Sequence, residues 1–280
     1  MEIQARAKIN WTLNVTGRRQ DGYHLLDMLM QPIALHDTLY INPARELSLT
    51  VEGAGELSAG EDNLVLRAAR ALQKAGGVSY GAALRLIKRI PMGAGLGGGS
   101  ADAAAALKGL SALWGLRYDL DALCEIGLKL GADVPFCLHD APRRAQGIGE
   151  ILSPILSEVY FLILLQPCAA LSTKEVFSAY HASSAAPSPD TQGAMEALAR
   201  GDLSALRACG GNVLESASIP LRPEILKAKE ALYASGASFA QMTGSGSAVF
   251  GVYAGAGAAK LAHEKLKTQY SPCILTQTAL

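Results

Sequence analysis

The sequence predicts a chain of interleaved strands and helices, either α+β or α/β with two sheets. Three observations favour this class. Strand-like and helix-like patterns alternate along the whole chain, no segment repeats, and 280 residues exceed what one compact core usually absorbs. The length therefore favours two packed domains or one large one. We place a domain boundary near residue 150, dividing residues 1–150 from 151–280, because residues 139–150 are rich in glycine, proline and charge.

The composition narrows the class of protein. Half of the residues are apolar, 18% are charged, and the 25 basic residues match the 25 acidic ones, so no net field would attract nucleic acid or anionic lipid. The longest aliphatic and aromatic run, residues 159–165, is far shorter than the roughly 20 residues of a membrane span. The amino-terminal residues lack the pattern of a secretory signal, and we expect a cytoplasmic protein. Five cysteines without a C-x-x-C pattern indicate neither a disulfide framework nor a zinc site.

The first elements follow from local patterns. Residues 5–15 alternate apolar and polar, as in a half-buried strand, which places Lys8 and Asn10 on one face. A turn-rich segment at 17–24 precedes an apolar run at 25–35 and a strand-like piece at 37–41. Asp62 is the expected N-cap of a helix over 63–75 that ends at a glycine pair. Residues 82–90 then indicate a strand.

The middle of the chain joins a glycine-rich loop to an alanine-rich helix, expected from about 100 to 113. A helix at 120–130 follows and ends at Gly131, and residues 132–135 form a turn that leads into a short apolar strand at 134–138. In the second half we expect a strand at 159–166, a helix at 173–180 and a loop at 183–193. Helices at 193–200, 203–208 and 222–235, a hairpin around residues 243–246, a helix at 256–269 and a strand at 273–278 complete the prediction.

The glycine-rich segment is the least ordinary feature. Five of the eight residues from Gly93 to Ser100 are glycine, and a strand precedes them while a helix follows. Such loops expose backbone N–H groups, and the helix amino terminus adds partial positive charge, so a phosphate chain can lie close. Ser100 would supply a hydroxyl for a phosphate or a magnesium ion. The alternative is a glycine turn that only serves close packing of a helix on a sheet.

Phosphate chemistry also needs a positive charge and a base. Lys8 stands mid-strand among apolar neighbours, and Asp133 stands in the turn before an apolar segment. Each residue also has an ordinary explanation. Lys8 would be solvated on an edge strand, and Asp133 would cap its own turn.

Four motifs together resemble the signatures of the GHMP kinases. They are residues 7–10 (AKIN), 91–101 (PMGAGLGGGSA), 131–135 (GADVP) and 243–248 (TGSGSA). The resemblance spans residues 5 to about 253 and implies a two-domain α+β fold. Each domain would pack a mixed or antiparallel sheet with helices, with the active site in the cleft between them. The further motif DGYH at 21–24 resembles members that phosphorylate the tertiary 2-hydroxyl of a cytidine diphosphate-linked methylerythritol with ATP.

The resemblance also implies roles for individual residues. Asp133 would take the hydroxyl proton, or hold it for late transfer. Lys8 would lower the pKa of that hydroxyl and screen Asp133 from the incoming phosphate. The substrate would be held by Asn10, by Tyr23 and Phe177 on the two faces of cytosine, by His24 at its polar edge, and by Thr173. The ATP phosphates would be held by two segments: Pro91, Met92, Gly93, Ala94, Gly95, Leu96, Gly97, Gly98, Gly99, Ser100 and Ala101, and then Gly244, Ser245 and Gly246.

Several points stay open at the level of sequence. Mg²⁺ is expected from the chemistry, but its ligand is unassigned, and Asp102 is interpreted as favouring the helix dipole from the first turn. A GHMP kinase for homoserine or a mevalonate derivative would keep Lys8, Asp133 and the glycine segment. A nucleotide-binding regulator without catalysis would keep the glycine segment alone. The only expected partner is the small-molecule substrate, with no nucleic acid or membrane, for a monomer or weak homodimer.

Overall fold

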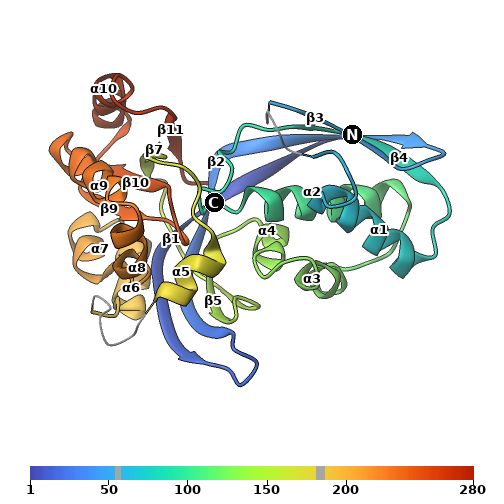
Figure 1. Cartoon of the computed structure of the whole chain (residues 1–280), viewed down its shortest axis with the longest axis horizontal. Coiled ribbons are helices and arrows are strands. Elements are labelled where there is room, and N and C mark those ends of the chain that lie inside the picture. Colours follow the sequence, from blue (N-terminus) through green and yellow to red (C-terminus); the bar gives the residue numbers. More distant parts are fainter. Residues whose placement is uncertain (54–57, 181–186) are drawn as a thin grey trace. The chain divides into compact units, whose positions relative to one another are not determined.

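The structure, a computed structural model, describes residues 1–53, 58–180 and 187–280 (Figure 1). These residues pack into two compact units, each built from several chain segments. Unit 1 contains Met1–Ala7, Leu35–Ile90 and Gly97–Asp140, and unit 2 contains Lys8–Ala34, Pro91–Leu96 and Ala141–Leu280. The long strands β1 (Glu2–Arg18) and β2 (His24–Ala44) contribute residues to both units. The domain division near residue 150 stays a prediction.

Unit 1 combines strands with four helices. Strand β4 (Gly81–Ile87) pairs antiparallel with the second part of β2 and parallel with β3 (Ser48–Glu52). The helices are α1 (Leu64–Gly76), α2 (Gly98–Leu113), α3 (Leu120–Leu128) and α4 (Val134–His139), and Figure 1 shows all four on one side of these strands. Helix α2 is buried along most of its length because its alanines permit close packing. A Cβ added at Gly109 would lie 2.3 Å from Ile41 Cδ1.

Unit 2 contains a four-stranded antiparallel sheet. Its order is β11 (Cys273–Gln277), β7 (Phe161–Leu165), β10 (Val249–Tyr253) and β9 (Phe239–Met242). Helices α9 (Glu224–Ala234) and α10 (Ala256–Leu266) pack on this sheet. Trp11 of β1 contacts the aromatic rings of Phe250 at 5.5 Å and Tyr160 at 5.2 Å between centroids, which ties β1 to the sheet.

The remaining elements of unit 2 surround β1 and the first part of β2. Strand β5 (Arg143–Gly147) pairs with β2 and with β6 (Ile151–Pro154), and β8 (Gly211–Asn212) pairs parallel with β1. The helices are α5 (Thr173–Ala179), α6 (Thr191–Arg200), α7 (Leu203–Cys209) and α8 (Glu215–Leu221). In the described part of the chain, no helix has the length and apolarity to cross a membrane.

The structure corrects four local predictions. The run at 25–35 and the strand at 37–41 are one continuous strand, β2, because strand pairing extends through residues that the pattern separates. Residues 134–138 are helical rather than extended, since a short apolar run fits either state and Pro135 favours a helix start. Strand β1 is buried on both faces rather than half-buried. The predicted loop at 183–193 partly lies outside the described residues, and α6 begins within it.

The N-cap of α1 is a further correction. Asn63, not Asp62, precedes the first helical residue, and its side-chain oxygen accepts a hydrogen bond from Val65 N at 2.9 Å. Gly77 ends the helix in the left-handed conformation with φ 63°, as the glycine pair predicts.

We expect Asn63→Ala to lower the free energy of unfolding by about 1 kcal/mol, because one buried helix N–H group loses its acceptor. Urea denaturation followed by circular dichroism measures this loss. Asp62→Ala is the matched control and should change stability by less than about 0.5 kcal/mol. A larger loss for Asp62→Ala than for Asn63→Ala would contradict the assigned cap.

Candidate active site

The glycine-rich segment has a backbone that only glycine adopts readily. Gly93, Gly95 and Gly97 have φ values of 62°, 76° and 70°, in the left-handed region. Gly97 is the N-cap of α2, so the helix begins two residues before the sequence predicts. The first N–H groups of any helix lack partners within it, and those of α2 therefore belong to the glycine segment itself.

These glycines also permit close packing. A Cβ at Gly95 would lie 2.2 Å from the carbonyl oxygen of Thr243, and one at Gly93 would lie 2.3 Å from Ala170 Cβ. At Gly98 and Gly99 the nearest atoms would be Ile90 Cγ2 and Leu64 Cδ1, both at 3.1 Å. The glycines of this segment therefore do serve close packing, which the sequence analysis gives as the alternative to phosphate binding. This packing constrains the same backbone whose N–H groups are predicted to hold phosphates.

Lys8 is buried at 4% exposure in unit 2, so it is not a solvated edge residue. Its ammonium donates hydrogen bonds to Gly95 O at 2.8 Å and to Asn10 Oδ1 at 2.9 Å. Its backbone N–H donates to Leu96 O at 2.9 Å. A buried ammonium is costly unless such acceptors surround it. The first strand and the glycine segment are therefore joined through this lysine.

Asn10 connects the same lysine to the second glycine motif, the loop at residues 243–246. Its Oδ1 also accepts hydrogen bonds from Gly244 N at 3.0 Å and Thr243 Oγ1 at 3.3 Å. Its backbone N–H donates to Thr243 Oγ1 at 3.1 Å. Because Asn10 is 1% exposed, these bonds replace solvent for its carbonyl oxygen.

The loop at residues 243–246 is a tight turn between β9 and β10. Gly244 and Gly246 have φ values of 57° and 85°, and Gly246 N donates to Thr243 O at 3.0 Å. The Ser245 hydroxyl lies 3.0 Å from Thr173 Oγ1, at the start of α5. Unit 2 thus brings together the predicted residues Lys8, Asn10, Gly95, Thr173 and those of this loop.

The predicted cytosine-binding residues His24 and Phe177 belong to a group of contacting rings in unit 2. The His24 ring stacks on Phe177 with centroids 5.0 Å apart, and Tyr180 meets His24 edge-on at 6.3 Å. Tyr23 is 62% exposed. Partial burial, and then the charge of Arg18, lower the pKa of His24, which favours its neutral form. A neutral imidazole can both donate and accept hydrogen bonds at the polar edge of a base.

In unit 1, the motif at 131–135 lies beside the start of α2. A Cβ added at Gly131 would lie 3.7 Å from Ser100 Oγ. Asp133 is the N-cap of α4, but its carboxylate makes no capping hydrogen bond within this fully described helix. The side chain of Asp133 is therefore not an N-cap acceptor for α4.

A buried ion cluster in unit 1 was not predicted. Lys88 forms ion pairs with Asp37 and, at 2.6 Å, with Asp102, and all three are less than 9% exposed. Because α2 starts at Gly98, Asp102 lies beyond the first turn and faces Lys88, so its interpretation as a helix-dipole residue is wrong. Asp37 also accepts a hydrogen bond from Ile90 N at 2.8 Å. The cluster fixes the end of β4 against α2.

Burial and the neighbouring charges shift the pKa values of two residues in this cluster. Burial raises the pKa of Asp102 to about 7, although Lys88 opposes the shift. Burial alone would lower the pKa of Lys88, but the carboxylates of Asp102 and Asp37 raise it. Asp102 Oδ1 finds no hydrogen-bond partner among the residues that the structure describes. Asp37, Lys88 and Asp102 come from three separate segments of the sequence, so this cluster can be recognised only once the topology is known.

Comparison with known proteins identifies the family. The chain matches the GHMP kinases N terminal domain over residues 63–141 and the GHMP kinases C terminal domain over residues 194–272. The two matches together cover more than half of the chain. It therefore belongs to the GHMP kinases, which confirms the predicted family and its two-domain fold of sheets packed with helices. As a member of a kinase family it uses ATP.

Relatives narrow the family further. A 4-diphosphocytidyl-2-C-methyl-D-erythritol kinase of Pelotomaculum thermopropionicum is 43% identical over 98% of this chain and 96% of its own. One of Alkaliphilus metalliredigens is 39% identical over 99% and 96%. A crystal structure of 4-(cytidine 5'-diphospho)-2C-methyl-D-erythritol kinase has a TM-score of 0.87 at 36% identity and covers 100% of both chains. Homoserine kinase from Cytophaga hutchinsonii, at 18% identity and TM-score 0.78, shares the fold.

We expect Gly95→Ala to disrupt the contact between the two glycine motifs of unit 2. Gly115→Ala is the matched control, because Gly115 has φ 65° but no described atom lies within 4 Å of an added Cβ. The control should lose about 1 to 2 kcal/mol of unfolding free energy from backbone strain alone. Gly95→Ala should lose about 1 to 3 kcal/mol more, from the collision with Thr243 O. Equal losses in urea denaturation would contradict the contact.

Proposed function

We propose that the chain transfers the γ-phosphate of ATP to the 2-hydroxyl of 4-diphosphocytidyl-2-C-methyl-D-erythritol, a step in non-mevalonate isoprenoid precursor biosynthesis. The full-length similarity to kinases named for this substrate supports the proposal. The structural observation that carries it is the buried ammonium of Lys8, which is bonded to Asn10 and to the glycine segment. A cation is rarely buried in this way without a function for its charge.

The proposed reaction divides two tasks between two residues. Asp133 accepts the proton of the 2-hydroxyl as its oxygen bonds to the γ-phosphorus, and the bond from that phosphorus to the bridging oxygen of ADP breaks. The positive charge of Lys8 favours the ionised hydroxyl and screens the negative charges that approach it. Asp133 stands at the start of α4, within the motif at 131–135 that resembles the family signature.

The glycine segment is proposed to hold the ATP phosphates. Residues 91–101 supply a glycine backbone with left-handed turns at Gly93, Gly95 and Gly97 and the amino terminus of a 16-residue helix. Such a terminus favours bound phosphate through its N–H groups and partial positive charge. Residues 244–246 are proposed to close over the phosphates from the second glycine motif.

The substrate cytosine is proposed to bind at the aromatic residues of unit 2. Phe177 and Tyr23 supply faces for stacking, and His24, whose pKa is lowered by burial, supplies a neutral polar edge. Asn10 and Thr173 contribute hydrogen bonds to the rest of the substrate. In this proposal the stacking of Phe177 on His24 orients the imidazole before cytosine arrives.

Mg²⁺ is proposed to enter as a complex with ATP. The described residues contain no group of three or more histidine, cysteine, aspartate or glutamate side chains that would hold a metal. This fits an ion held mainly by phosphates and water, as Mg²⁺ often is, and no residue is assigned to it. Bound Mg²⁺ would neutralise phosphate charge.

We also propose a cytoplasmic protein that acts as a monomer or weak homodimer. The five cysteines are widely spaced and follow no disulfide pattern, as is usual in a reducing compartment. ATP is available there as the phosphate donor.

The function is tested by comparing phosphorylation of three acceptors under the same conditions. With purified protein, ATP and Mg²⁺, 4-diphosphocytidyl-2-C-methyl-D-erythritol should be turned over at least 100-fold more efficiently than homoserine or mevalonate, since only it fills a cytosine site. Equal or better turnover of either alternative acceptor would overturn the substrate assignment. ATP binding without turnover of any acceptor would favour a regulator.

We expect Asp133→Asn to lower kcat by roughly two to four decades, the scale of a lost acid-base group. The dissociation constant for ATP, measured by calorimetry, should change less than about threefold. Asp119→Asn is the control, because Asp119 caps α3 through its side chain and an asparagine can do the same. Nearly unchanged turnover in Asp133→Asn would remove the proposed base.

A further inference from the structure

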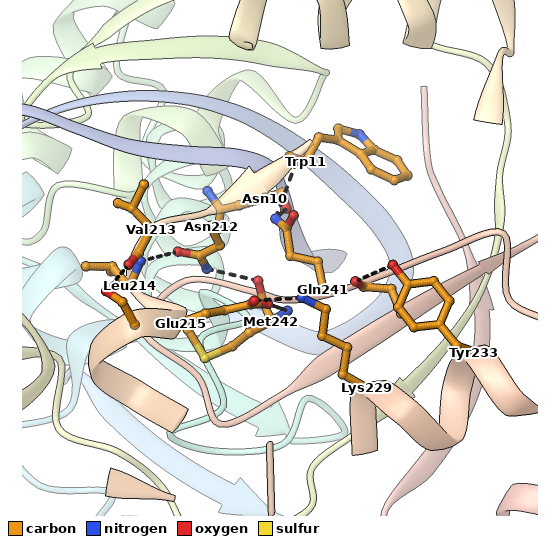
Figure 2. A network of polar contacts seen from close by, with 12 residues as sticks. Asn10, Trp11, Asn212, Val213, Leu214, Glu215, Lys229, Tyr233, Gln241 and Met242 are labelled. Carbon is orange, nitrogen blue, oxygen red and sulfur yellow. Dashed lines mark hydrogen bonds and ion pairs between the residues drawn. The ribbon is translucent and has the colours of Figure 1, made fainter. Parts of the chain in front are cut away.

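Asn212 is a buried polar residue that no part of the sequence analysis singled out. It lies in the two-residue strand β8, opposite Leu13 of β1, and is 4% exposed. Figure 2 shows its side chain between the turn that begins α8 and the end of β9. A buried amide must satisfy its donors and acceptor locally, so its partners indicate what it holds in place.

Asn212 is bonded to both sides of Thr243. Its Nδ2 donates to Met242 O at 2.9 Å and to Gly244 O at 2.8 Å, and its Oδ1 accepts from Leu214 N at 3.0 Å. One amide nitrogen thus holds the two carbonyl groups that flank a single residue. This fixes the orientation of two peptide planes in the loop at 243–246.

The loop continues this connection to the catalytic lysine. Gly244 N donates to Asn10 Oδ1 at 3.0 Å, and that same oxygen accepts the Lys8 ammonium at 2.9 Å. A Cβ at Gly244 would lie 3.3 Å from Lys8 Nζ. Asn212, Gly244, Asn10 and Lys8 therefore form one continuous chain of contacts within unit 2.

Neighbouring residues hold the base of this chain rigid. Glu215 accepts a hydrogen bond from Met242 N at 2.9 Å and pairs with Lys229 at 2.7 Å (Figure 2). Gln241 Nε2 donates to Asn10 O at 3.0 Å (Figure 2). Because these bonds anchor β9 independently of Asn212, we expect a change at Asn212 to act mainly on the loop beyond Met242.

We propose that Asn212 is a positioning residue for phosphoryl transfer, acting through the backbone of Gly244 to fix Asn10 Oδ1 and with it the ammonium of Lys8. This inference rests on the proposed function for its kinetic consequence. In this proposal Asn212 contacts neither substrate, and the partners of its side chain given above are backbone groups. Its proposed effect is on the position of the Lys8 ammonium. A small displacement of such a group lowers kcat more than it weakens substrate binding.

The variant Asn212→Asp tests this with little change in shape. The carboxylate still accepts from Leu214 N but opposes Met242 O and Gly244 O with an oxygen instead of a donor. We expect kcat to fall roughly 10- to 100-fold, while KM for ATP and for the cytidine substrate stays within about threefold. Ser216→Ala is the control. It removes a bond to Val213 O in the same turn without touching the loop, and it should keep its kcat.

A double variant separates positioning from general damage. In a Lys8→Met background, adding Asn212→Asp should lower the remaining rate less than twofold, because the residue acts through Lys8. The same 10- to 100-fold loss in both backgrounds would overturn the inference while leaving the proposed function intact. Wild-type protein that phosphorylates no cytidine substrate would overturn the proposed function.

Hydrogen exchange tests the contact chain without any substrate. In Asn212→Asp, the amide of Gly244 should exchange at least tenfold faster than in wild type, while in Ser216→Ala its rate should not change. An unchanged rate in Asn212→Asp would overturn the inference whatever the kinetic assay shows.

Discussion

The carbonyl oxygen of the Asn10 side chain is the interaction on which the rest of the site depends. It accepts hydrogen bonds from the Lys8 ammonium, from Gly244 N and from the Thr243 hydroxyl, at 2.9, 3.0 and 3.3 Å. An isolated ammonium at 4% exposure would be strongly destabilising, and this oxygen together with Gly95 O offsets that cost. The loop at 243–246 therefore helps to hold the acceptor that stabilises the buried Lys8 ammonium.

Glycine serves two purposes at once in this fold. At Gly95 the absence of a side chain lets two loops of unit 2 meet, and at Gly98 and Gly99 it lets α2 begin close to its neighbours in unit 1. Close packing and exposed backbone N–H groups both follow from a missing Cβ, so the two explanations for the glycine segment do not compete. In unit 1, the ion cluster of Lys88 with Asp37 and Asp102 stabilises the start of the same helix.

Much of this could be predicted from local pattern, and the rest could not for identifiable reasons. Period-2 alternation places Lys8 and Asn10 on one face, and the glycine segment predicts the start of α2 to within two residues. The ion pairs of Lys88 and the hydrogen bonds donated by Asn212 Nδ2 join residues between 14 and 51 positions apart, and no local pattern indicates them. The helical state of residues 134–139 depends on packing against α2 and α3, which outweighs a short apolar run. Roles in catalysis came from family resemblance and stay predictions.

A double-variant cycle between Asn10 and Lys8 tests the central claim most directly. The rates kcat of Asn10→Ala, Lys8→Met and the variant that combines them are compared with wild type, with folding checked by circular dichroism. If the Asn10 oxygen acts by holding the Lys8 ammonium, the combined variant should be no more than about twofold slower than Lys8→Met alone. Losses that multiply, as for two independent residues, would contradict the account.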